Sequence, residues 1–164
     1  MKNIIIAILL LLSAPVCMAS QDNQENGKTA GSEFSLKNPE FAHKIPFAKA
    51  HIVMQISSGD PAHWNLALNT MQNLLNFFGI DKVQIVAVAF GPGEKMLFRN
   101  SPMAERVSSL DKEGVEFDAC GNTYKELTKK LGHAPELNPQ AVMVPAGIVR
   151  IMQLQEDKFN YVNP

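Results

Sequence analysis

The stretch Val83-Gln-Ile-Val-Ala-Val-Ala-Phe90 decides the fold class of this chain. It is apolar almost throughout, which is typical of a strand buried on both faces of a parallel sheet. The loop Gly91-Pro92-Gly93 follows directly and ends the strand. We therefore expect residues 83–90 to form a strand of a sheet that is covered by helices on both sides.

Strand-like and helix-like segments alternate on either side of this stretch. Repeated units of a strand followed by a helix imply right-handed crossovers and a mostly parallel sheet. The sequence thus predicts an α/β fold in which the sheet has five strands, the last of them short. The predicted strands are residues 51–57, 83–90, 115–119, 141–144 and 161–162, and the predicted helices are 61–78, 101–113, 123–131 and 147–157.

Two of the predicted helices carry clear signals at their ends. Asp60 can cap the first helix, Pro61 occupies its first position, and Gly79 stops it. Thr123 and Glu126 have the spacing of a capping box. We therefore expect the helix that follows Cys120 to begin at Thr123.

The first residues have the three parts of a secretory signal. Lys2 provides the positive charge, residues 4–12 form an apolar run, and Pro15 breaks that run. Residues 17–19 place small side chains before Ser20, where we expect cleavage. The apolar run is shorter than the ~20 residues that a membrane-spanning helix needs. The alternative, lipidation of Cys17, is disfavoured by the residues directly before it.

These patterns divide the chain into three parts. Residues 1–19 are the predicted signal peptide, so we expect a periplasmic protein that has no membrane attachment after cleavage. Residues 20–49 are a polar, flexible lead-in followed by an extended arm, which packs on the domain or serves as an oligomer contact. Residues 50–164 are the predicted α/β domain.

Composition and spacing argue against several classes of partner. The formal net charge is −1, and no basic run is interleaved with aromatic residues, so we expect no nucleic-acid partner. His43, His51 and His133 have no metal-ligand spacing, which predicts no metal site. The glycines match neither the phosphate-loop nor the dinucleotide pattern, so no cofactor is expected.

Cys120 is the strongest candidate for chemistry. Cys17 lies in the predicted signal, which leaves Cys120 unpaired in the mature protein. It stands between a predicted strand and a helix start, where free backbone N–H groups and the helix dipole favour the thiolate form. The alternative is that Cys120 is a small apolar residue that closes the strand.

Four glycine-containing loops follow the predicted strands, at residues 57–60, 91–93, 120–122 and 145–147. The carboxyl ends of parallel strands share one edge of the sheet, where ligands usually bind. His63 can act there as a base or orient an anion, or it can simply be solvated. We predict Cys120 as the catalytic residue and an anion site built from Gly59, Asp60, His63, Gly91, Gly93, Gly121, Asn122 and Gly147.

Four segments resemble the DsrE/DsrF-like family in its exported branch. The resemblance covers about residues 50–164, and its most specific parts are Ala-Cys-Gly-Asn-Thr and Pro-Ala-Gly-Ile-Val-Arg. The segments read VMQISSGDPAHWNLALNTMQNLLNFFG, VAFGPGEKMLF, GVEFDACGNTYKEL and VPAGIVRIMQLQ.

The resemblance implies a three-layer α/β/α fold that assembles as trimers or hexamers. It also implies that Cys120 carries sulfur as a persulfide and delivers it to a thiol-bearing acceptor protein. This agrees with the chemistry of a stabilised thiolate, which attacks a sulfur donor and passes the outer sulfur on. The sulfur-relay members of the family work in the cytoplasm with dedicated partners, whereas this chain has an export signal.

Three functions follow from these observations. The first is a periplasmic sulfur carrier, or sulfurtransferase-like protein, that uses Cys120. The second is an oligomeric module whose glycine loops bind a small anion, with no chemical role for Cys120. The third is a thiol redox sensor that forms a disulfide between molecules.

Overall fold

A computed structural model describes residues 39–164. The predicted signal peptide at 1–19 and residues 20–38 of the lead-in lie outside the described residues. Within residues 39–164, no helix is both long and apolar enough to span a membrane.

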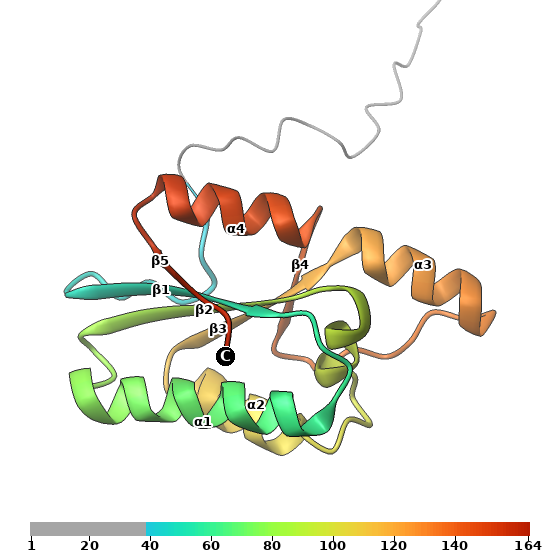
Figure 1. The fold of residues 1–164 in the computed structure, drawn as a ribbon, viewed down its shortest axis with the longest axis horizontal. Coiled ribbons are helices and arrows are strands. Elements are labelled where there is room, and N and C mark those ends of the chain that lie inside the picture. Colours follow the sequence, from blue (N-terminus) through green and yellow to red (C-terminus); the bar gives the residue numbers. More distant parts are fainter. Residues whose placement is uncertain (1–38) are drawn as a thin grey trace, which may run out of the picture. The chain divides into compact units, whose positions relative to one another are not determined.

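The described part contains a five-stranded sheet in the order β4-β3-β2-β1-β5. All four pairs of neighbouring strands are parallel, and helices lie on both faces of the sheet (Figure 1). The predicted three-layer α/β/α fold is therefore confirmed. The strands are β1 (Ala50–Ile56), β2 (Val83–Ala89), β3 (Val115–Cys120), β4 (Ala141–Val144) and β5 (Asn160–Val162).

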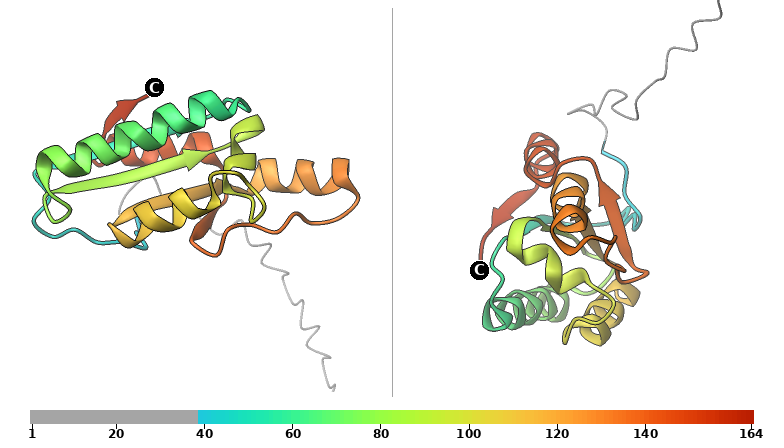
Figure 2. Two further views of the ribbon diagram at one scale, coloured as in Figure 1. Left: turned by 90° about the horizontal axis from the view of Figure 1, so that it is seen from below. Right: turned by 90° about the vertical axis from the view of Figure 1, so that its right-hand side faces the viewer.

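The helices divide between the two faces and one end of the sheet. Helices α1 (Pro61–Phe78) and α2 (Ala104–Lys112) lie on one face, and α4 (Gly147–Glu156) lies on the other (Figures 1 and 2). Helix α3 (Gly121–Leu131) extends from the end of β3 and has no buried residue. A 3₁₀ helix, η1 (Gly91–Leu97), follows β2 where the sequence predicted only a loop.

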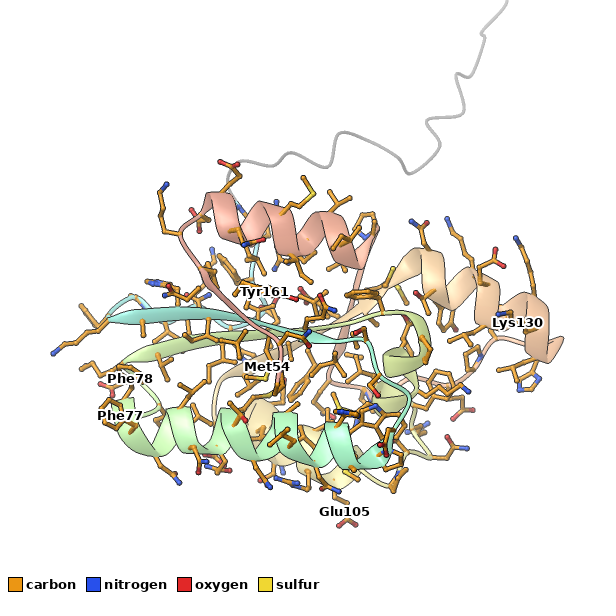
Figure 3. All side chains as sticks on the ribbon, viewed as in Figure 1. Met54, Phe77, Phe78, Glu105, Lys130 and Tyr161 are labelled. Carbon is orange, nitrogen blue, oxygen red and sulfur yellow. The ribbon has the colours of Figure 1, made fainter. Side chains whose placement is uncertain are left out.

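Both faces of the sheet are packed, as the apolar stretch at 83–90 predicted. Every residue of β2 is buried. Side chains alternate along the strands, so Ile52 and Met54 of β1 join the core under α1 and α2, whereas Val53 joins the core under α4. Met54 is seen between the sheet and α1 in Figure 3.

The predicted ends of α1 are confirmed. The Asp60 side chain accepts a hydrogen bond from the Ala62 N–H at 2.9 Å, Pro61 is the first helical residue, and Gly79 caps the carboxyl end. The long amphipathic pattern and the caps agree here, and both predicted ends are therefore correct.

The predicted start of α3 is wrong. The helix begins at Gly121, because Thr123 is not its cap: the Thr123 hydroxyl accepts a hydrogen bond from the Gly91 N–H at 2.9 Å. Glu126 contacts Lys129 at 2.8 Å instead of reaching back to a cap. A tertiary contact with the loop after β2 has thus replaced the local capping box.

The predicted start of the second helix is also early. Helix α2 begins at Ala104, three positions after the expected Ser101. The Ser101 hydroxyl accepts a hydrogen bond from the Met103 N–H at 3.2 Å, which makes a local turn before the helix.

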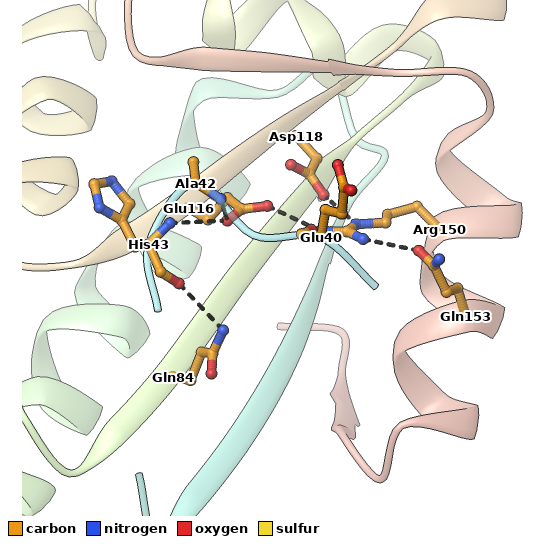
Figure 4. Close-up of polar contacts among 8 residues, drawn as sticks. All are labelled: Glu40, Ala42, His43, Gln84, Glu116, Asp118, Arg150 and Gln153. Atoms are coloured by element: carbon orange, nitrogen blue, oxygen red, sulfur yellow. Dashed lines mark hydrogen bonds and ion pairs between the residues drawn. The ribbon is translucent and has the colours of Figure 1, made fainter. Parts of the chain in front are cut away.

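A buried ionic cluster lies between β3 and α4 (Figure 4). The Arg150 guanidinium donates to Asp118 Oδ2 at 2.8 Å and to Glu116 Oε1 at 2.9 Å. All three side chains are almost completely buried. Burial, together with the neighbouring Glu116 charge, raises the pKa of Asp118. One guanidinium therefore donates to two buried carboxyl groups at once.

The same cluster holds the segment before β1 against the domain. Arg150 also donates to the Glu40 carbonyl at 2.8 Å, and Glu116 Oε2 accepts from the Ala42 and His43 N–H groups at 2.6 and 3.3 Å. The half-buried His43 ring contacts Asp111 Oδ1 through Nε2 at 2.8 Å. The described part of the predicted arm thus packs on its own domain.

Substitutions in this cluster should separate the charge from the hydrogen bonds. Arg150→Met leaves Glu116 buried without a cation and should lower the free energy of unfolding by about 3–5 kcal/mol. Asp118→Asn keeps the shape of the side chain and, because burial raises the pKa of Asp118, should cost less than about 1 kcal/mol. Urea unfolding of both variants at pH 7 measures this difference. Equal costs would show that Asp118 is ionised.

Candidate functional site

Cys120 is both the last residue of β3 and the N-cap residue of α3. No side chain caps the first turn of that helix. The thiol therefore belongs to the residue at the positive end of an 11-residue helix, a setting that stabilises negative charge. Cys120 is a free cysteine and only 6% exposed. Its environment is thus more enclosed than the sequence indicated.

The loops after the strands meet along one edge of the sheet. The Gly91 N–H donates to the hydroxyl of Thr123, which joins the loop after β2 to α3. A Cβ atom added to Gly59 would lie 3.0 Å from Pro92 Cβ, and one added to Gly147 would lie 3.3 Å from Cys120 Cβ. The four glycine loops are therefore neighbours in space, as the parallel sheet requires.

Close packing explains why glycine stands at several of these positions. A Cβ atom on Gly93 would lie 2.2 Å from the Ile56 carbonyl oxygen, and one on Gly121 would lie 3.1 Å from the Val144 carbonyl oxygen. A Cβ atom on Gly147 would lie 3.1 Å from the Phe90 Cβ atom. These glycines let the loops at this edge of the sheet pack closely, and Gly147 lets its loop approach Cys120.

Glu94 is a site residue that the sequence did not reveal. It lies in η1, is fully buried, and accepts a hydrogen bond at Oε2 from the Cys120 N–H at 3.1 Å. Its other oxygen, Oε1, has no hydrogen-bond partner within residues 39–164. Burial raises the pKa of Glu94 to about 8, against the smaller lowering effect of the Cys120 N–H. Glu94 is therefore a neutral acid at pH 7.

No local signal could have identified Glu94. It stands in a glycine-rich turn beside Lys95, which is the usual setting of a solvated carboxylate. Only the packing of η1 against β2, β3, α1, α2 and α3 buries it.

His63 and Asp60 follow the end of β1, and His63 lines a separate hollow there. His63 Nδ1 is 3.1 Å from Ser58 Oγ and 3.5 Å from Asp60 Oδ2, so both neighbours meet the same ring nitrogen. A proton relay needs one partner on each nitrogen, which this arrangement lacks. The hollow has a volume of about 240 Å³ and is also lined by Gln55, Trp64 and Asn163.

Asn122 faces a third environment. It is exposed at the start of α3 and lines a hollow of about 540 Å³ with Tyr124 and Lys125. The residues predicted to form one anion site thus have different neighbours. Gly121 follows Cys120 in the chain, and Gly147 lies close to the Cys120 side chain. The Gly91 N–H donates to Thr123, whereas Gly93 packs on Ile56 and Gly59 packs on Pro92. Asp60 and His63 follow β1, and Asn122 is exposed.

No group of three His, Cys, Asp or Glu side chains in residues 39–164 is arranged to hold a metal ion.

Comparison with known proteins finds structures of similar fold. The structure titled protein of unknown function MTH1491, from Methanobacterium thermoautotrophicum, matches with a TM-score of 0.63 and 28% sequence identity. The match covers 70% of this chain and 99% of the other. No protein-family model matches the chain, and no curated protein matches it. The relative supports the fold and carries no information about activity.

Substitution of Gly93 should test the close approach of η1 and β1. Gly93→Ala places a methyl group inside the van der Waals radius of the Ile56 carbonyl and should cost about 3 kcal/mol of folding free energy. Gly132→Ala is the matched control: it has φ +75° but no atom within 4 Å of the new Cβ, so about 1 kcal/mol is expected. Thermal and urea unfolding measure both, and an equal cost would contradict the close approach.

The raised pKa of Glu94 should make stability depend on pH. The ordinary value is 4.5 and the folded value is about 8, so the native state keeps a proton that the unfolded chain releases. The free energy of unfolding should therefore fall as the pH rises through this window, by up to about 1.4 kcal/mol per pH unit from this group.

Glu94→Gln should remove that contribution and leave a shallower slope. Glu126→Gln is the control, because Glu126 is exposed and paired with Lys129. Urea unfolding between pH 5 and pH 8 measures the slopes. A Glu94→Gln slope equal to that of the wild type would show that Glu94 is ionised in the folded protein.

Proposed function

We propose that this protein carries sulfane sulfur as a persulfide on Cys120. The observation that carries the proposal is the position of Cys120 as the N-cap residue of α3, with a first turn that no side chain caps. A thiolate or persulfide anion at this point is stabilised by free N–H groups and by the helix dipole.

The buried surroundings of Cys120 support a carrier more than a redox sensor. A disulfide between two molecules requires both Cβ atoms to approach to about 4 Å. Cys120 is 6% exposed, and Gly147 covers it at close range, so a second folded protein would be obstructed. A small sulfur donor needs far less room, and an outer persulfide sulfur extends the reach of the side chain.

The wider setting follows the resemblance to the DsrE/DsrF-like family. We place the protein in the periplasm because of its predicted signal peptide, and we propose a homo-oligomer, a trimer or a hexamer. The persulfide sulfur would pass to an acceptor thiol by attack of the acceptor thiolate on the outer sulfur. The anion-binding alternative has support only from the separate hollow beside His63.

Intact mass before and after exposure to polysulfide tests the proposal. Wild type should gain the mass of whole sulfur atoms, reductant should reverse the gain, and Cys120→Ser should show none. Since Ser keeps the size and the N-cap position, loss of the gain would reflect the missing sulfur atom. Equal uptake by Cys120→Ser, or no uptake by wild type, would contradict the proposal.

A further inference from the structure

Helix α3 projects from the end of the sheet and has no buried residue (Figure 1). Helices of a globular domain usually bury an apolar face against the core. In α3 the apolar residues do not reach this degree of burial: Tyr124 and Leu127 are half-buried, and Leu131 is 48% exposed. The helix therefore leaves most of its surface available to a partner.

A hollow of about 540 Å³ lies along this helix. It is lined by Ala134 and by residues of α3 from Asn122 to Lys129, a span of about 10 Å along the helix axis. A second hollow, of about 560 Å³, shares Ala134 with the first and is also lined by Arg99 and Leu131. The two hollows are therefore neighbours, and we call them together the α3 surface.

The helix beside these hollows is positively charged, although the chain has a formal net charge of −1. Lys125, Lys129 and Lys130 are exposed on it, and Figure 3 shows Lys130 near its outer end. Lys129 contacts Glu126 at 2.8 Å, whereas Lys125 and Lys130 form no ion pair within residues 39–164. An exposed pair such as Lys129–Glu126 is weak and can be exchanged for contacts with a partner. The charge of the helix therefore favours an acidic partner.

The α3 surface begins beside the thiol. Asn122 lines the first hollow and stands two positions after Cys120. Lys125 and Lys129 follow at about 7.5 and about 14 Å from Cys120 along the helix axis. An extended polypeptide spans the longer distance with about four residues. A polypeptide bound on α3 can therefore bring a thiol to Cys120.

We propose that the α3 surface binds an acidic polypeptide segment of the protein that accepts sulfur from Cys120. This inference rests on the proposed sulfur-carrier function and states how the acceptor is recognised. The acceptor thiolate, R–S⁻, attacks the outer sulfur of Cys120–S–SH and takes it as R–S–SH. The S–S bond to Cys120 breaks and its electron pair stays on the Cys120 thiolate, so atoms and electrons balance.

The dimensions of the α3 surface favour a polypeptide over other anions. The first hollow is about 10 Å long and adjoins the second, so a small anion would occupy only part of the surface. Tyr124, Ala134 and the aliphatic stems of the lysines also offer apolar contacts to a side chain of the partner. A nucleic acid would match the charge, but it brings no thiol to Cys120.

Binding of labelled peptides, measured by fluorescence anisotropy, tests the docking site without sulfur. The acidic peptide carries a serine in place of the acceptor cysteine, one leucine, and several glutamates that begin about four residues from the serine. In its control peptide, glutamines replace the glutamates. Wild type should bind the acidic peptide about 10-fold more tightly at low salt, and about 0.5 M NaCl should remove most of this preference. Equal binding of the two peptides would overturn the docking site.

Charge reversal locates the binding site on the protein. The double variant Lys125→Glu, Lys129→Glu should lose the preference for the acidic peptide, because attraction becomes repulsion. Lys44→Glu, Lys112→Glu is the matched control with the same change in net charge. These two exposed lysines precede β1 and β3, whereas α3 follows the carboxyl end of β3. The control should bind within about 2-fold of wild type, and equal losses in both double variants would overturn the docking site.

Sedimentation velocity of the same variants tests whether a second copy of this chain covers α3 instead. Wild type and both double variants should have the same oligomeric state. A smaller oligomer for Lys125→Glu, Lys129→Glu alone would overturn the proposal and assign α3 to a subunit interface.

Sulfur transfer to cysteine-containing forms of the same peptides separates this proposal from the carrier function. From persulfide-loaded wild type, the acidic peptide should accept sulfur about 10-fold faster than the control peptide at low peptide concentration. Equal rates would overturn the docking site and leave the carrier function standing. Selective binding by a wild type that takes up no sulfur would overturn the carrier function and leave the acidic-peptide site standing.

Discussion

All seven residues of β2 are buried, and the sheet can accommodate such a strand only if helices cover both of its faces. This constraint gives β2 a place inside the sheet, with β1 and β3 as parallel neighbours. It also brings the loops after these strands to one edge, so that Cys120 and Glu94 lie together although they are 26 positions apart in the sequence.

Burial raises the pKa of two acids in this part of the protein, Glu94 and Asp118. Glu94 faces a neutral N–H group, so it avoids a buried charge by keeping its proton. Burial also raises the pKa of Asp118, and the neighbouring Glu116 adds to this effect while Arg150 opposes it. The Asp118 cluster anchors the segment before β1, whereas Glu94 contacts the one residue suited to sulfur chemistry. Two acids whose pKa is raised by burial thus have different contacts, one in the ionic cluster and one at the backbone of Cys120.

The helix ends show how far local sequence information extends. Asp60, Pro61 and Gly79 act within their own helix, and both ends of α1 agree with the prediction. Thr123 and Glu126 have equally good local spacing, yet the Thr123 hydroxyl accepts a hydrogen bond from the distant Gly91 N–H. Local capping rules hold where no distant backbone group competes for the capping side chain. They fail at the sheet edge, where loops from different strands meet.

The sequence by itself determined the parallel α/β fold, because the apolar and helical periodicities are local patterns that only this layering can bury. It also determined the position of Cys120 between a strand and a helix, because the residues that form this junction are consecutive in the chain. Only the tertiary structure decided the burial of Glu94 and its bond to the Cys120 N–H. It likewise divided the predicted anion site between two strand ends and α3. Burial and pairing of this kind depend on contacts between segments far apart in the chain, and no local pattern encodes them.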